Sequence, residues 1–191
     1  SACATPASPM YGLTATSAAA LALRLGGPSI PSMKQRTPPT PDKAYERLAD
    51  ACARAEYCTH ELREKMRRMG LAATDAEAVL RRLREERYVD DARFARAFVR
   101  QNTEFARWGR RKIAYALALK RIDRATIADA LADIDDEKYA STLHTLLAAK
   151  ARANGPDALT TYDGRTRLFR FAASRGFESD AIAAAIRKLM E

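Results

Sequence analysis

Tyr88-Val-Asp-Asp-Ala-Arg-Phe-Ala-Arg-Ala-Phe-Val99 is the segment from which the helical pattern of this chain can be followed in both directions. Asp90 is a good N-cap, and Asp91 adds a second negative charge to the first turn of the helix that it predicts. At about 100° per residue, Phe94 and Phe98 fall on one face and three arginines on the other. Those arginines are Arg93, Arg96 and Arg100. The apolar face is suited to packing, and the basic face is either solvated or used for binding.

The same apolar spacing occurs three times after residue 43. The second set of five residues follows the first by 51 positions, and the third follows the first by 106. The three sets are Leu62, Met66, Leu71, Leu80 and Leu83; Ile113, Leu117, Ile122, Leu131 and Ile134; and Leu168, Ala172, Phe177, Ile186 and Leu189. Each set spans two helices and follows a further helix. The sequence therefore predicts an all-α fold of three tandem three-helix repeats that form an elongated, curved array.

We assign the repeats to residues 43–89, 90–134 and 135–191. Residues 1–42 are rich in Ala, Ser, Thr and Pro and predict a disordered extension, because such a segment buries too little apolar surface to offset its ordering entropy. We also hypothesise that the natural chain starts at Met33, just before a Pro-rich stretch. We recognise neither a membrane-spanning run nor an export signal, so a cytoplasmic protein is expected.

Helix ends are predicted from single residues. Gly70 and Gly176 stand where a left-handed residue ends a helix, and the apolar residue after each can fold back on that helix. Arg121 holds this place in the middle repeat, where the turn is either strained by about 1 kcal/mol or built differently. Thr59 is predicted to cap one helix of the first repeat, and Thr74-Asp-Ala-Glu77 predicts a capping box for the next.

Positive charge is concentrated in the middle repeat. The chain carries a net charge of +9, and residues 89–124 contribute ten basic against four acidic side chains. This balance favours a polyanion or an acidic protein as partner. The predicted helix start at residues 107–112 adds backbone N–H groups that suit phosphate contacts. Trp108 is interpreted as a packing anchor rather than a base-stacking residue. The predicted contact residues are Arg93, Arg96, Arg100, Arg107, Arg110, Arg111 and Lys112.

No catalytic residue, cofactor or metal is predicted. His60 and His144 are isolated from carboxylates and cysteines at the spacing of a ligand set or a catalytic triad. Cys3, Cys52 and Cys58 are odd in number and lack the paired spacing of a zinc site, which favours free thiols.

Several motifs resemble those of the RecX family of bacterial regulatory proteins, from about residue 43 to the end. The residues that carry the resemblance are Gly70, Tyr88, Asp90, Asp91, Phe94, Phe98 and Gly176, with Glu61-Leu62, Gly109-Arg-Arg-Lys-Ile113 and Ser174-Arg-Gly-Phe177. The resemblance implies a non-enzymatic protein that binds the RecA recombinase filament on DNA and restrains its growth, ATP hydrolysis and strand exchange. It also implies affinity for single- and double-stranded DNA, and a role in DNA repair, homologous recombination and the SOS response. Ala116 and Arg121 depart from the family pattern, which has an acidic residue and a glycine there.

Two other functions stay open at this point. A three-helix unit can place a helix in the major groove, so a general DNA-binding protein without a recombinase partner is one alternative. A scaffold for protein partners is the other, and it would present an apolar surface rather than a basic one. A monomer is expected in each case.

Overall fold

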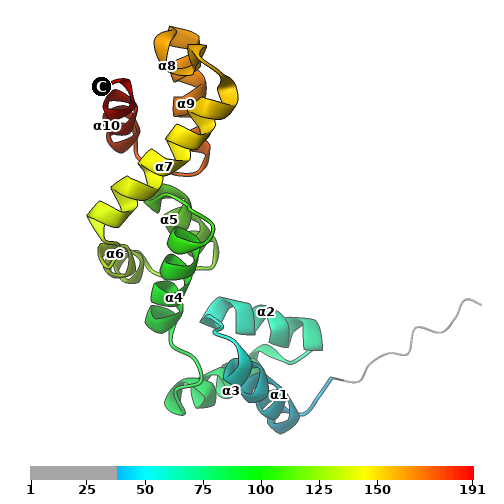
Figure 1. Ribbon diagram of the computed structural model, residues 1–191. Coiled ribbons are helices and arrows are strands. Elements are labelled where there is room, and N and C mark those ends of the chain that lie inside the picture. Colours follow the sequence, from blue (N-terminus) through cyan, green and yellow to red (C-terminus); the bar gives the residue numbers. More distant parts are fainter. Residues whose placement is uncertain (1–37) are drawn as a thin grey trace, which may run out of the picture. The chain divides into compact units, whose positions relative to one another are not determined.

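Helices are the only regular structure in residues 38–191, the part of the chain that the computed structural model describes (Figure 1). Met33 and most of the predicted extension lie outside the described residues. The ten helices of the described part are α1 (Pro41–Arg54), α2 (Thr59–Met69), α3 (Ala73–Glu85), α4 (Asp91–Glu104), α5 (Arg110–Leu119), α6 (Arg124–Ala132), α7 (Asp136–Asn154), α8 (Asp157–Thr160), α9 (Tyr162–Ser174) and α10 (Ser179–Met190). The predicted all-α class is confirmed. None of these ten helices is long and apolar enough to cross a membrane.

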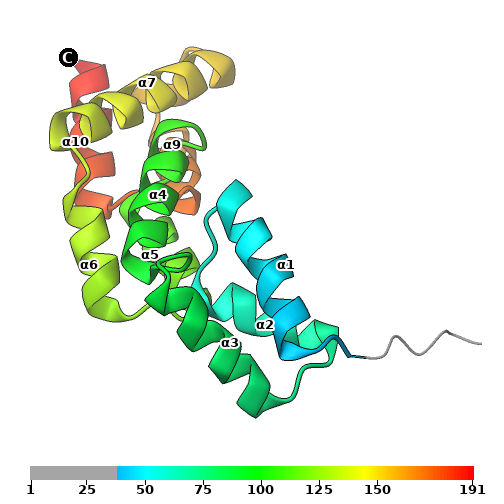
Figure 2. The ribbon, with the colours of Figure 1, turned by 90° about the horizontal axis from the view of Figure 1, so that it is seen from below.

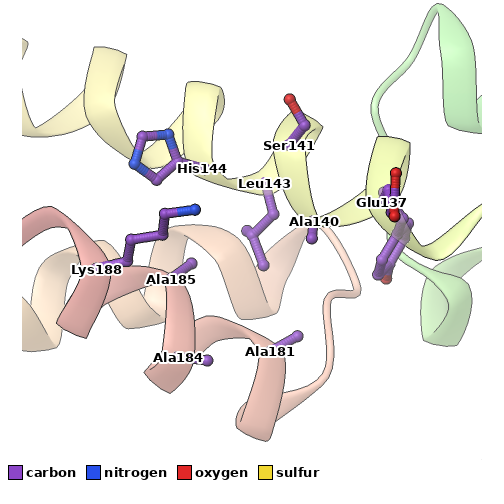
Figure 3. Close-up of a pocket in the computed structure, with 10 residues that line it drawn as sticks. Glu137, Ala140, Ser141, Leu143, His144, Ala181, Ala184, Ala185 and Lys188 are labelled. Carbon is purple, nitrogen blue, oxygen red and sulfur yellow. The ribbon is translucent and has the colours of Figure 1, made fainter.

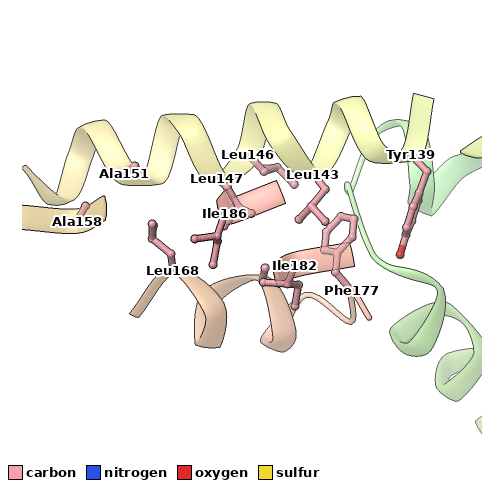
Figure 4. Close-up of a cluster of buried hydrophobic side chains, with 11 residues drawn as sticks. Tyr139, Leu143, Leu146, Leu147, Ala151, Ala158, Leu168, Phe177, Ile182 and Ile186 are labelled. Carbon is pink, nitrogen blue, oxygen red and sulfur yellow. The ribbon is translucent and has the colours of Figure 1, made fainter. Parts of the chain in front are cut away.

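Three hydrophobic cores divide the helices into a first group (α1–α3), a middle group (α4–α6) and a third group (α7–α10). The helices of the first group lie together in both views (Figures 1 and 2). Leu48, Leu62, Met66, Leu80 and Leu83 are fully buried in its core. The middle core contains Phe94, Val99, Ile113, Leu117 and Ile127. The third is built around Leu143, Leu147, Leu168, Phe177 and Ile182 (Figure 4). The residue ranges assigned to the repeats, and the curvature of the array, remain predictions.

The repeated apolar spacing is confirmed by burial. All fifteen residues of the three sets belong to the three cores or pack against them. The spacing also extends to helix starts, because the residues before α3, α6 and α10 are Ala72, Asp123 and Glu178. These residues are related by the same shifts of 51 and 106 positions. One apolar register therefore fixes where the last helix of each group begins and which residues of the last two helices pack in the core.

The C-terminal turns of α2, α5 and α9 share one conformation. Gly70 and Gly176 have positive φ angles of 80° and 88°, as predicted. Arg121 adopts the same left-handed conformation, with a φ of 58°. In each turn the following residue donates its backbone N–H back to the helix, for example Ile122 to the carbonyl of Leu117 at 3.2 Å. The middle turn is therefore kept rather than rebuilt, at a cost of about 1 kcal/mol for the side chain of Arg121.

Two predicted N-cap residues are wrong. α3 begins at Ala73 instead of at the expected capping box, and Glu77 pairs with Arg63 of α2 at 2.7 Å. The N-cap of α2 is Cys58 rather than Thr59, and the Glu61 side chain accepts from the Cys58 N–H at 3.3 Å. In both cases the N-cap precedes the hydroxyl residue, since Cys58 lies one residue before Thr59 and Ala72 lies two residues before Thr74. The Asp90 N-cap is confirmed.

The first and middle groups meet where the start of α2 reaches the end of α5. The backbone N–H of Thr59 donates to Asp91 of α4 at 2.7 Å. Cys58 is buried in the middle core, with its Sγ 4.0 Å from the carbonyl oxygen of Lys120. Lys120 in turn pairs with Glu61. The first turn of α2 is therefore built into the middle group.

The middle and third groups meet in the same way, at the start of α5 and the end of α9. The N–H of Gly109 donates to the carbonyl of Arg175 at 2.8 Å, and that of Arg111 to the carbonyl of Gly176 at 3.1 Å. The Arg110 side chain pairs with Asp136, the first residue of α7, at 2.5 Å. In the repeat register, Arg110 corresponds to Thr59. Both contact the first aspartate of the next group's leading helix.

Helix α8 is an addition to the predicted three-helix plan of the third group. Gly155 and Pro156 connect the end of α7 at Asn154 to the start of α8 at Asp157. The backbone of α8 packs on Gly164, where an added Cβ would lie 2.2 Å from the carbonyl oxygen of Asp157. Gly164 occupies in the third group the repeat position that Gly109 occupies in the middle group. On α9, α8 therefore covers the surface that corresponds to the contact between α5 and the third group.

Candidate interaction surface of the middle group

Arg93 connects two groups instead of lying free on α4. Its Nε pairs with Glu56 at 2.7 Å, and its terminal nitrogens donate to the carbonyls of Arg87 and Tyr88 at 3.2 Å. The opposite face of α4 is buried through Phe94, while Phe98 is only half-buried. The predicted division of α4 into an apolar and a basic face is therefore correct, but Arg93 already has protein partners.

Arg96 and Arg100 line a cleft of about 830 Å³ between α4 and α7. The cleft is mixed in charge, because Asp133, Asp135 and Glu137 line it as well. Arg96 lies 3.5 Å from Asp133, and both side chains are mostly exposed. Arg100 is exposed and forms no ion pair within residues 38–191. Of the α4 arginines, Arg100 is thus the one whose charge is available.

Arg110 holds the start of α5 against the third group. Its guanidinium lies 4.2 Å from the ring centre of Tyr139 and reaches Glu178 at 3.9 Å as well as Asp136. The Tyr139 hydroxyl accepts from the N–H of Arg110 at 3.0 Å and donates to Glu178 at 2.6 Å. Burial, followed by the hydrogen bond to Glu178, raises the pKa of the Tyr139 hydroxyl well above its ordinary value. Arg110 is therefore a structural residue of the junction.

The start of α5 does not offer free N–H groups to a phosphate, contrary to the sequence-based expectation. The first three N–H groups, of Gly109, Arg110 and Arg111, donate to Arg175, Tyr139 and Gly176. These acceptors belong to residues far along the chain, so no local pattern could show that the helix start is occupied.

Two further basic side chains lie open on this part of the group. Arg107 and Arg111 are exposed and, like Arg100, form no ion pair with any described residue. The Nζ of Lys112 instead lies 4.4 Å from the ring centre of Trp108, which packs against the middle core as predicted. Of the seven predicted contact residues, we keep Arg100, Arg107 and Arg111 as the free arginines.

Three exposed apolar side chains accompany the free arginines and were missed by the sequence reasoning. Tyr115 and Leu119 are 67% and 63% exposed and follow Arg111 at successive turns of α5. Arg111, Tyr115 and Leu119 together are called the α5 stripe. Phe105 is 80% exposed at the end of α4. The repeat register holds the signal that identifies two of them, because the positions of Tyr115 and Leu119 are filled by polar residues in the other groups. Those residues are Glu64 and Arg68 in the first group, and Arg170 and Ser174 in the third.

No three His, Cys, Asp or Glu side chains between residues 38 and 191 gather as a possible metal site. A pocket of about 470 Å³ between α7 and α10 has an alanine-rich floor, with His144 and Lys188 facing each other across it (Figure 3). Cys52 and Cys58 are free thiols, and burial raises the pKa of both. Cys3 lies outside the described residues.

Tandem helical groups tied end to end define a helical-repeat protein, and its middle group exposes basic and apolar side chains. The family model described as "RecX, second three-helix domain" matches residues 90–131. Regulatory protein RecX of Xanthomonas axonopodis pv. citri is 30% identical over 154 residues, which are 81% of this chain and 88% of the relative. The chain therefore belongs to the RecX family of regulatory proteins.

Other relatives agree with this assignment. Regulatory protein RecX of Clostridium perfringens (strain 13) is 27% identical over 129 residues, and the chain spans 60% of that relative's length. The crystal structure of RecX from Lactobacillus salivarius has a TM-score of 0.69 with 20% identity over 78% of this chain and 96% of that one. A second structure, of regulatory protein RecX, has a TM-score of 0.67 with 23% identity, covering 74% of this chain and 69% of that one. At these identities the two structures support the fold.

Proposed function

We propose that this protein binds the RecA recombinase filament on DNA and restrains filament growth, ATP hydrolysis and strand exchange. Membership of a family of regulatory proteins supports this function. The observation that carries it for this chain is the combination of the free arginines with the exposed α5 stripe. Such a surface matches a partner that presents phosphates or carboxylates beside apolar side chains.

The free arginines are suited to binding because their charges are not already neutralised. Arg93 and Arg110 would have to leave internal partners before they could bind a new anion. The free arginines lose only water and loosely held counterions when they bind. A contact between one of them and a phosphate therefore gains the full free energy of counterion release. Tyr115 is of a residue type enriched among the side chains that dominate binding energy at protein interfaces, and Leu119 adds apolar area beside it.

The junctions contribute by fixing the spacing of the groups before binding. The start of α2 is held by Asp91 and the start of α5 by the C-terminal turn of α9. A binder whose contact surfaces are already held in place spends less entropy on association, and contacts from several groups then act together. A protein that contacts several filament subunits in this way would oppose the rearrangements of those subunits that accompany ATP hydrolysis.

General DNA binding is the second candidate function, because the free arginines would also suit bare DNA. The two candidate functions differ in whether binding requires RecA and in how strongly it depends on salt. Binding that depends on DNA alone falls steeply with salt and requires no RecA. Binding to a filament requires RecA and keeps the apolar part of its affinity at higher salt.

ATP turnover by RecA of the same organism on single-stranded DNA, titrated with this protein, tests the proposal. We expect inhibition by the wild type and weaker inhibition by the triple variant Arg100→Ala, Arg107→Ala, Arg111→Ala. The matched control replaces three other exposed arginines, each without an ion pair within residues 38–191: Arg54→Ala, Arg152→Ala, Arg167→Ala. Equal loss in both triple variants would mean that only net charge matters, and absence of inhibition by the wild type would refute the proposed function.

A further inference from the structure

A groove of about 760 Å³ runs between α9 and α10 on the third group. Its apolar lining includes Phe169 and Ile186, with Tyr162 and Met190 left 77% and 53% exposed. Three arginines, Arg165, Arg170 and Arg187, also line it, and none of the lining residues is acidic. The groove therefore combines an open apolar floor with a rim of one charge.

Comparison with the first group in the repeat register shows why this groove is open. In the first group, Arg63 of α2 and Glu77 of α3 close the corresponding space with two hydrogen bonds, at 2.7 and 3.0 Å. Phe169 and Ala183 stand at those positions in the third group. A salt bridge that joins two helices is thus replaced by an aromatic ring and a methyl group, and the groove stays open.

A second polar tie between the helices is missing in the same way. Arg84 of α3 donates to the hydroxyl of Thr59 at 3.0 Å in the first group. Its counterpart in the third group is Met190, whose side chain is half-exposed at the end of the groove. Two independent replacements therefore turn a polar, closed helix pair into an apolar, open one.

The rim charge is concentrated at the groove and does not reflect the whole third group. Residues 135–191 carry nine basic and eight acidic side chains. None of the three rim arginines forms an ion pair with a described residue. Arg165 is held in position by donating to the carbonyls of Leu159 and Thr160, both at 2.9 Å. A positively charged rim is thus maintained in a group that is otherwise close to neutral.

We propose that this groove binds an acidic amphipathic segment of a partner protein. Apolar side chains of the segment pack between Phe169, Ile186 and Met190, and its carboxylates pair with Arg170 and Arg187. This is the helix-in-groove mode, in which one apolar helix face supplies area and flanking charges supply specificity. The proposal does not depend on the filament-binding function of the middle group.

Other occupants fit the groove less well. Residues 1–36 of the chain contain no acidic residue and three basic ones, so this segment has the same sign of charge as the rim and is repelled by it. Single-stranded nucleic acid would match the arginines, but it is bound through rows of exposed aromatic side chains on which bases stack. Here only Tyr162 has a largely exposed ring, because Phe169 is half-buried, and Ala183, Ile186 and Met190 supply the rest of the apolar floor. The chemistry therefore favours apolar side chains between carboxylates.

The test uses the full chain and a labelled synthetic peptide of about 14 residues, four helical turns long. Leucines on one face and glutamates elsewhere give it the proposed chemistry. Fluorescence anisotropy is expected to show saturable binding, which weakens by about tenfold or more in Arg170→Glu, Arg187→Glu. The control, Arg152→Glu, Arg167→Glu, makes the same charge change outside the groove and is expected to stay within about twofold of the wild type. Met190→Lys tests the apolar floor while adding positive charge, and it is expected to weaken binding.

Several results would overturn the proposal. A scrambled peptide of the same composition that binds equally well would show that the apolar face is not recognised. Equal weakening by both double variants would reduce the effect to net charge. Displacement of the peptide by an equal concentration of oligothymidylate would reassign the groove to nucleic acid. A self-association of the protein that only the groove variants abolish would assign it to a second copy. Circular dichroism checks that each variant is folded.

Discussion

Gly109 and Gly176 lie backbone against backbone where the middle group meets the third. A Cβ added to Gly109 would stand 2.2 Å from the carbonyl carbon and oxygen of Gly176. The N–H groups of Gly109 and Arg111 donate across this contact, to Arg175 and Gly176. The close approach is what allows the start of α5 to be satisfied by the end of α9, so any side chain at Gly109 separates two helices as well as filling space.

Gly109→Ala is therefore expected to lower the free energy of unfolding by about 3 kcal/mol, through overpacking and the loss of the junction hydrogen bonds. The neighbour is backbone and cannot move aside as a flexible side chain would. Urea unfolding measures the effect, and hydrogen exchange is expected to show lost protection at Gly109 and Arg111.

Gly70→Ala is the matched comparison for this prediction. Its φ of 80° costs an alanine about 1 kcal/mol, but the nearest atom to an added Cβ, on Pro38, is an ordinary 3.4 Å away. If Gly109→Ala proved milder than Gly70→Ala, the close approach at the junction would not control stability.

Arg121→Gly is expected to stabilise the protein by about 1 kcal/mol. Arg121 is exposed and has a φ of 58°, a conformation that glycine adopts without a steric penalty. The same substitution inside a helix, Arg167→Gly in α9, is expected to cost about 1 kcal/mol. Opposite shifts of the urea midpoint for the two variants are the expected result, and two destabilising shifts would contradict the role assigned to the Arg121 turn.

Asp90 links helix capping to pH. Hydrogen bonds from the N–H groups of Arg93 and Ala92, the larger effect coming from Arg93, lower the pKa of the Asp90 carboxyl. A lowered folded-state pKa gives stability that is present above the unfolded value, about 3.9, and is lost as the pH falls through the folded value.

Asp90→Ala should consequently cost about 1 kcal/mol near neutral pH, and the difference from the wild type should shrink below about pH 4. Asp90→Asn keeps a capping oxygen but cannot titrate, so its difference from the wild type should reverse or vanish in acid. Urea unfolding at several pH values checks both. A difference for Asp90→Ala that did not change with pH would mean that the ionised carboxylate is not the stabilising form.

Helix content and core membership could be predicted from the sequence because both follow from local spacing. All fifteen repeated apolar positions pack in the cores, and Gly70, Gly176 and Asp90 end or cap helices as expected. The half-buried position of Phe98 was less predictable. Helical periodicity shows toward which side a residue points, but it does not show how much of the side chain a neighbouring helix covers.

The contact surface could be predicted only in part, because pairing partners are distant in the sequence. Glu56 lies 37 residues before Arg93, and Asp136 lies 26 residues after Arg110. A count of basic residues could not distinguish the two arginines that already pair with acidic residues from Arg100, Arg107 and Arg111. Comparison of equivalent repeat positions, in contrast, could have identified Tyr115 and Leu119, since only the middle group places apolar residues there.

The α5 stripe can be tested by giving it the residues of the first group. Tyr115→Glu with Leu119→Arg introduces the side-chain types of Glu64 and Arg68 and leaves the net charge unchanged. Both positions are exposed, so the free energy of unfolding should stay within about 0.5 kcal/mol of the wild type. If the stripe lies at the centre of the filament contact, the concentration needed for half-inhibition of RecA ATP turnover should rise about tenfold or more.

A charge-neutral change on another exposed helix face separates this effect from a general one. Thr145→Glu with Ala149→Arg places the same two side chains four residues apart on exposed positions of α7. This variant should inhibit like the wild type, because α7 contributes no part of the proposed stripe. Unchanged inhibition by the α5 variant would remove Tyr115 and Leu119 from the interface and leave the free arginines to account for binding, which would then be as sensitive to salt as DNA binding alone.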